Sequence, residues 1–174
     1  MFRKRLLTLF LVPVSLLAAS AQESLFSGGI ESNSFLDVDG QFHANNYLKL
    51  DYSRGRFSAG LQAEYYPRPL PGYDLNLQGI GLPGKYLAWT DSRWSVTVGD
   101  FYEQFGTGIL LRSWEDRNLG WNNSIGGVRL SVTTPDERFS MKVLSGAKRE
   151  YLWYSAQDNL LGAEATLRLG TFSF

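Results

Sequence analysis

The chain has 174 residues, with 17 Lys and Arg against 17 Asp and Glu, and therefore no formal net charge. This balance argues against nucleic-acid binding, which requires clustered cations that displace the counterions of the phosphate backbone. The chain contains no cysteine, which excludes disulfides, thiol catalysis and thiolate metal sites. We expect no cofactor, no bound metal and no catalytic residue.

The amino-terminal segment MFRKRLLTLFLVPVSLLAASAQ has the features of a signal peptide. A basic cluster is followed by an apolar run from Leu6 to Leu17 and by Ala19-Ser20-Ala21, a small-x-small cleavage pattern. The apolar run is too short for a spanning helix, which needs roughly 20 residues. The sequence thus predicts a cleavable signal peptide over 1–21 and one exported domain over 22–174.

Apolar and polar residues alternate along much of this domain, as they do in strands with two different faces. In RFSAGLQAEYY, the residues from Phe57 to Tyr65 place apolar side chains on one face and polar or very small ones on the other. WSVTVG, VRLSVT and LGAEATLRLG show the same pattern. Strands are predicted over 25–36, 42–52, 57–66, 85–90, 93–102, 124–133, 138–148 and 160–170.

The predicted connections alternate in length. Those after the second, fourth and sixth strands are short (SRGR, DS and TPDE), whereas those after the third, fifth and seventh are long; the short first loop, near 37–41, is the exception. Tight turns at one end and long loops at the other are typical of outer-membrane barrels. Aromatic residues near the strand ends would form an interfacial girdle: Tyr52, Tyr65, Tyr66, Trp89, Trp94, Trp153 and Tyr154.

We therefore predict an all-β fold, namely an antiparallel up-and-down transmembrane β-barrel or the first eight or so strands of a larger one. Its expected location is the outer membrane, and its expected partners are outer-membrane lipid and the barrel-insertion machinery. A narrow barrel of about eight strands is filled by its own side chains, so transport would require a larger barrel. Passive transport, surface binding and envelope structure all fit this architecture.

The segment GDFYEQFGTGILLRSWEDRNLGWNNS, residues 99–124, is the candidate site. Its charged residues are Asp100, Glu103, Arg112, Glu115, Asp116 and Arg117. Two of the carboxyl groups could serve a glycosidase, which needs them at a defined separation across a sugar ring. The interleaved arginines instead favour a structural ion network in the lumen or a loop, for example with Arg112 paired to Glu103.

The alternative is a secreted β-sandwich that binds carbohydrate, because the strands of a sandwich alternate in the same way. Trp114, Trp121, Trp153 and Tyr154 would then stack on sugar rings. Many alanines on the apolar face and long loops at one end favour the barrel. A small solute or a glycan is a possible ligand in both architectures.

Residues 98–130 combine Gly-Asp-Phe-Tyr, Phe-Gly-x-Gly, Leu-Arg-x-x-Glu-x-Arg, Leu-Gly and an Asn pair. This combination resembles an uncharacterised family of outer-membrane β-barrel proteins from anaerobic Gram-negative bacteria, and FSAGLQAEYYPRPLPG and GLPGKYLAW are similar to the same family. The resemblance implies a considerably longer barrel without an established activity. We therefore expect an amino-terminal fragment, incomplete at its carboxyl end, since Phe172 and Phe174 are out of phase with the apolar residues of the last strand.

Overall fold

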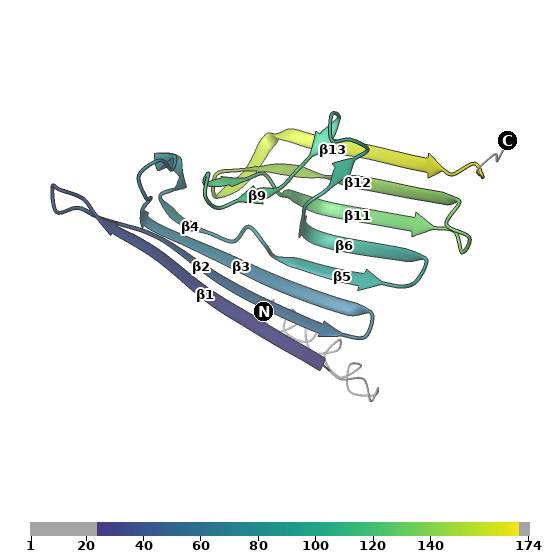
Figure 1. Cartoon of the computed structure of the whole chain (residues 1–174), viewed down its shortest axis with the longest axis horizontal. Helices are drawn as coiled ribbons and strands as arrows, with labels where there is room; N and C mark the ends of the chain where they lie inside the picture. The colour runs from purple at the N-terminus through teal and green to yellow at the C-terminus, as the bar shows by residue number, and fades with distance from the viewer. Residues whose placement is uncertain (1–23, 171–174) are drawn as a thin grey trace, which may run out of the picture.

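The computed structural model of the chain describes residues 24–170. Its main feature is one large antiparallel sheet in which eight strands follow the order β1-β2-β3-β5-β6-β11-β12-β13, so that strands consecutive along this path are neighbours in space (Figure 1). The predicted signal peptide and the terminal Phe172 and Phe174 lie outside the described residues. Over residues 24–170, no helix is long and apolar enough to cross a membrane.

The predicted all-β fold and its eight main strands are confirmed. The strands of the sheet are β1 (Ser24–Leu36), β2 (Phe42–Arg54), β3 (Phe57–Arg68), β5 (Tyr86–Thr90), β6 (Trp94–Phe101), β11 (Ile125–Thr133), β12 (Phe139–Glu150) and β13 (Trp153–Leu167). The short elements are η2 (Leu75–Leu77), β4 (Gly79–Gly81), β7 (Gln104–Phe105), β8 (Leu111–Arg112), β9 (Glu115–Asp116) and β10 (Trp121–Asn122). β4 pairs with β3, whereas β7 with β8 and β9 with β10 form two small separate sheets.

The connections of the sheet differ at its two ends. The short turns after β2, β5 and β11 lie at one end, on the right in Figure 1, and the long segments after β3 and β6 lie at the other. The predicted long loop after the seventh strand is wrong. β12 and β13 continue to pair up to Glu150 and Trp153, which leaves only Tyr151 and Leu152 in the turn. A register shift between Ala147 and Arg149 interrupts the alternation there, and this irregularity hid the strand pairing in the sequence.

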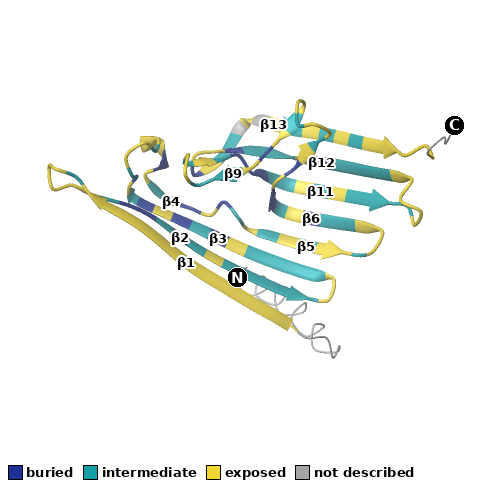
Figure 2. Cartoon of the chain, viewed as in Figure 1, coloured by how far each residue is buried: buried dark blue, intermediate teal, exposed yellow. Residues whose placement is uncertain are grey.

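The two faces of the sheet have opposite chemistry. On β3, Leu61 is 37% exposed, whereas its neighbour Gln62 is only 8% exposed and Glu64 only 2%. We call the face that carries Gln62 and Glu64 the inner face, and the face that carries Leu61 the outer face. Buried residues gather at the long-loop end of the sheet (Figure 2). On β3, polar side chains are thus covered while apolar ones stay exposed, which is the reverse of a water-soluble sheet. The inner face also buries an apolar cluster of Phe101, Ile125 and Leu144 under the long-loop end.

The sheet curves strongly around its inner face. Arg149 on β12 reaches Glu64 on β3 with an Nη2–Oε2 distance of 2.6 Å, although β5, β6 and β11 lie between these strands. Four strand spacings of about 4.8 Å would separate them by roughly 19 Å in a flat sheet. The sheet is nevertheless not closed, because β1 and β13 are each paired along one edge only in the described part of the chain.

A row of glycines crosses three adjacent strands of the sheet. Gly99, Gly127 and Gly146 are direct cross-strand partners on β6, β11 and β12. A Cβ atom on Gly127 would lie 2.0 Å from the carbonyl oxygen of Ser145, which is far inside van der Waals contact. The absence of side chains therefore lets the backbones approach closely at this level of the curved sheet.

Candidate functional site

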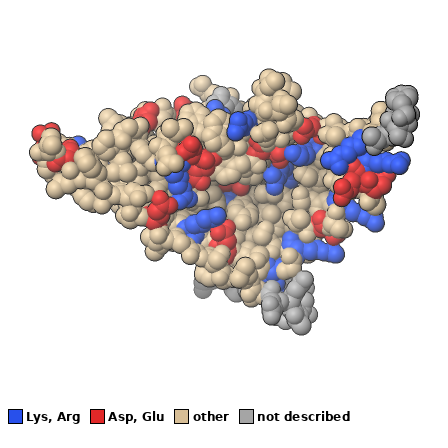
Figure 3. All heavy atoms as spheres, viewed as in Figure 1, with Lys and Arg blue, Asp and Glu red and all other residues tan. Residues whose placement is uncertain are grey.

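The connection between β6 and β11, residues 102–124, folds back onto the inner face, and we call it the inserted loop. Its Phe105 ring occupies the space above Gly162 of β13, where a Cβ atom would lie 2.7 Å from the ring. The backbone N–H of Gly106 donates to Glu164 Oε1 at 2.6 Å. In the space-filling view, Lys and Arg side chains interleave with Asp and Glu across the molecule (Figure 3). The inserted loop is therefore held by both apolar and charged contacts.

Glu103 anchors the beginning of the inserted loop. Its carboxylate accepts from Lys142 Nζ at 2.9 Å and from Arg129 Nη1 at 3.2 Å, and its side chain is buried. Burial alone would raise the pKa of Glu103, but hydrogen bonds from Lys142 and the Gln104 N–H, with the charges of Lys142 and Arg129, outweigh it. The pKa of Glu103 is therefore below its ordinary value, and the carboxylate stays ionised at neutral pH.

Glu115 and Arg117 hold the second half of the inserted loop. Glu115 Oε1 accepts from Arg117 Nε at 3.2 Å and from Gln62 Nε2 at 3.0 Å. Arg117 also donates through Nη1 to Glu31 Oε2 on β1 at 2.7 Å, and its guanidinium lies 4.5 Å from the centre of the Tyr47 ring. This pair thus connects the loop with the first three strands of the sheet.

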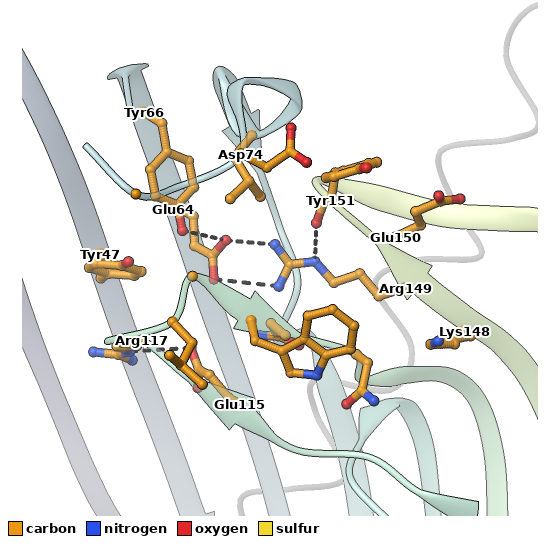
Figure 4. A pocket seen from close by; sticks show the side chains of 17 residues that line it. Tyr47, Glu64, Tyr66, Asp74, Glu115, Arg117, Lys148, Arg149, Glu150 and Tyr151 are labelled. Atoms are coloured by element: carbon orange, nitrogen blue, oxygen red, sulfur yellow. Dashed lines mark hydrogen bonds and ion pairs between the residues drawn. The ribbon is translucent and has the colours of Figure 1, made fainter. Parts of the chain in front are cut away.

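The pair of Glu64 and Arg149 lies deepest at this site (Figure 4). Both side chains are 2% exposed. Glu64 also accepts from the Tyr66 hydroxyl at 3.1 Å, and Arg149 Nε donates to the Tyr151 carbonyl at 2.5 Å. The sequence-based reasoning did not select either residue. The alternation on β3 placed Glu64 on the polar face, but Arg149 fell into the loop that was wrongly predicted.

The remaining candidates from the sequence have separate roles. Asp100 Oδ2 accepts from the backbone N–H of Lys85 at 2.8 Å and lies 3.3 Å from Lys85 Nζ. Asp116 accepts from the backbone N–H groups of Asn118 and Leu119 and so shapes the turn of the loop. The Arg112 guanidinium lies 5.1 Å from the Trp114 ring centre.

The six candidates therefore do not form one network. Over the described residues, the ion pair that they make among themselves joins Glu115 to Arg117. The suggested pairing of Glu103 with Arg112 is not present, because Glu103 contacts Arg129 and Lys142 on the sheet. Both of these cations occupy polar positions of alternating strands, so their face could be read from the sequence although their partner could not.

A cavity of about 380 Å³ opens between the inserted loop and the long-loop end of the sheet. Its walls combine aromatic rings, paired charges and glycines from four parts of the chain. The lining residues are Tyr47, Glu64, Tyr66, Gly72, Asp74, Leu77, Glu115, Arg117, Leu119, Gly120, Trp121, Asn122, Asn123, Lys148, Arg149, Glu150 and Tyr151.

The chain matches a known family over almost its full length. A model described as a family of unknown function (DUF6029) matches residues 1–173. The chain belongs to this family. No curated protein and no solved structure matches it.

In this DUF6029 chain, three of the four carboxylates of the candidate site contact cations of the described residues, whereas Asp116 accepts from backbone N–H groups. Lys85 contacts Asp100, Lys142 and Arg129 contact Glu103, and Arg117 contacts Glu115. The arrangement is suited to fixing the loop and lining a polar cavity.

Proposed function

We propose that this chain forms the wall of an outer-membrane β-barrel, with lipid against the outer face and water against the inner face. The observation that carries the proposal is the reversed burial of the sheet. Leu61, Leu87 and Val98 are exposed on the outer face, whereas Glu64, Thr97 and Arg149 are buried on the inner face. A sheet with this distribution matches lipid on one side and a polar lumen on the other.

The height of the apolar surface supports the same placement. On β3, outer-face residues run from Phe57 to Tyr65 and include Leu61. At a rise of about 3.4 Å per residue, this stretch spans roughly 27 Å along the strand. The apolar band of an outer-membrane barrel is about 25 Å tall and its strands tilt by about 35 to 45°. At that tilt the stretch covers roughly 19 to 22 Å of the band, which is most of its height.

Aromatic residues mark the tight-turn end of the outer face. Trp89 of β5 is the cross-strand partner of Phe57 on β3, and the ring centre of Tyr52 lies 6.4 Å from that of Phe57. Trp94 is the first residue of β6, and Phe139 is the first residue of β12. Rings of this kind favour the boundary between lipid and water. The row corresponds to the periplasmic interface, because periplasmic turns are the short ones.

The proposed role is passive: uptake or surface binding of a small polar solute, or support of the envelope, without catalysis. The inserted loop supports this role because it narrows the space beside the inner face and forms a cavity with it. A secreted sandwich would need a second layer over the outer face. Within residues 24–170, both small sheets contact the inner face instead, through Phe105 of β7, whose ring lies against Gly162, and through Glu115 of β9, which accepts from Gln62.

The resemblance of residues 98–130 indicates the expected source of the chain, namely the outer membranes of anaerobic Gram-negative bacteria.

The deciding experiment is fractionation of the expressed chain together with gel migration before and after heating. We expect recovery with outer membranes and faster migration of the unheated sample, because a paired membrane sheet resists detergent. Recovery in the soluble periplasm, with the same migration before and after heating, would contradict the proposal.

A further inference from the structure

We propose that the cavity between the inserted loop and the sheet binds a small neutral saccharide, a monosaccharide or a disaccharide. The proposal rests on the proposed outer-membrane function, because the cavity lies at the long-loop end, which faces outward in such a barrel. Its volume of about 380 Å³ falls in the lower part of the range of small-ligand pockets, roughly 300 to 1,000 Å³.

The charges that line the cavity argue against an ionic ligand. Glu64 is paired with Arg149 and Glu115 with Arg117, so neither pair presents a net charge. The other charged lining groups have mixed signs, since Lys148 lines the cavity together with the acidic Asp74 and Glu150. An anion would meet carboxylates in this cavity and a cation would meet ammonium and guanidinium groups. A neutral ligand avoids both repulsions.

The Glu115–Arg117 pair offers the hydrogen bonds that adjacent hydroxyls require. Glu115 uses Oε1 for both of its side-chain partners, which leaves Oε2 as an acceptor. Arg117 uses Nε and Nη1, which leaves Nη2 as a donor, and its side chain is one-third exposed. One sugar hydroxyl could donate to Oε2 while its neighbour accepts from Nη2.

Trp121 supplies the apolar surface that such a ligand needs. It lies on β10, where its cross-strand partner on β9 is Asp116. Trp121 is 45% exposed and lines the same cavity as Glu115. The C–H face of a sugar ring packs against an aromatic ring, while the hydroxyl groups at its edge find the polar groups. The Trp121 ring centre lies 6.0 Å from that of Trp114 and 5.9 Å from Lys148 Nζ, so part of the ring is left for a ligand. The cavity therefore combines a partly exposed ring with a donor and an acceptor that have no partner among the described residues, as recognition of a polyhydroxylated ring requires.

The test is titration of the detergent-purified full chain with a panel of glucose, galactose, mannose, N-acetylglucosamine, maltose and lactose, followed by calorimetry and Trp fluorescence. Glycine, a zwitterion without net charge, and lysine, a net cation, serve as ionic comparison ligands. We expect at least one sugar to bind in the millimolar range or tighter. Trp121→Ala should weaken binding about tenfold or more, and Trp121→Phe should retain part of the affinity.

Trp153→Ala is the matched control, because Trp153 is also exposed but does not line the cavity. The affinity of this variant for the sugar should equal that of the parent chain. Glu115→Gln should weaken binding without changing the far-ultraviolet circular dichroism. The inference is overturned if no sugar of the panel binds, if only the amino acids bind, or if Trp121→Ala binds as well as the parent. Sugar binding by a soluble periplasmic protein would instead contradict the proposed membrane location alone.

Discussion

Arg149 of β12 and Glu64 of β3 form a buried ion pair although 85 positions separate them in sequence and three strands separate them in the sheet. The pair links β3 and β12 across the concave side of the sheet and stabilises the curvature at the long-loop end. Removal of one partner should leave an uncompensated buried charge, because both side chains are 2% exposed.

We therefore expect Arg149→Met to lower the free energy of unfolding by about 3 to 5 kcal/mol. Chemical denaturation in detergent, followed by circular dichroism, measures this loss. The double variant Glu64→Met with Arg149→Met removes both charges and should recover much of the stability. A double variant that is no more stable than the single one would show that the charge balance of this pair is unimportant.

Orientation toward lipid is tested by two adjacent positions of β3. Leu61→Arg places a cation on the outer face near the middle of the apolar stretch, where it should cost roughly 2 to 4 kcal/mol in a membrane. Gln62→Arg places the same cation on the inner face, close to the Glu64 and Glu115 carboxylates that Gln62 now contacts. The yield of heat-modifiable protein in outer membranes should fall much more for Leu61→Arg. Equal yields would refute the assigned orientation.

Docking of the inserted loop should depend on pH through Glu103. Its pKa in the folded chain lies below the ordinary value of 4.5, so the folded state favours the ionised form. The stabilisation that ionised Glu103 gives to the docked loop is fully present above about pH 4.5. It is lost as the pH falls through the lower pKa that Glu103 has in the folded chain. Hydrogen exchange over residues 103–113, corrected for the intrinsic rate, should therefore accelerate at acid pH.

Glu103→Gln should show faster exchange of the same segment already at neutral pH, with little further change on acidification. Glu137→Gln is a suitable control, because Glu137 is exposed and its ion pair with Arg168 is long at 3.9 Å. If the parent and Glu103→Gln respond identically to acid, another group controls the docking of the loop.

The glycine row can be tested by adding a single methyl group. Gly127→Ala would bring a Cβ atom to 2.0 Å from the Ser145 carbonyl oxygen, and the strands would have to separate. We expect a loss of about 1 to 3 kcal/mol in the free energy of unfolding, measured by chemical denaturation. Gly29→Ala on β1 has no neighbouring atom within 4 Å of its added Cβ and should be nearly neutral. Equal stabilities of the two variants would show that β11 and β12 do not require close approach.

The sequence by itself determined the strands, their order and the chemistry of their faces. The alternation from Phe57 to Tyr65 assigns Leu61 and Gln62 to opposite faces of the strand, because successive side chains of a strand point to opposite faces. This assignment does not depend on which strands lie beside β3. Short polar turns fix which strands pair, since a tight connection forces antiparallel neighbours. The pattern failed between β12 and β13, where a register shift breaks the period of two.

Only the tertiary structure decided which charges meet. Glu103 lies in the inserted loop, whereas Arg129 and Lys142 lie on β11 and β12, and no local period relates a loop residue to a strand that follows it. The cavity likewise exists only because the sheet curves and the loop folds back on its inner face. The curvature of the sheet results from many small twists between paired strands and from close backbone contacts such as that at Gly127. For this reason, local periodicity determined the faces, and long-range packing determined the site.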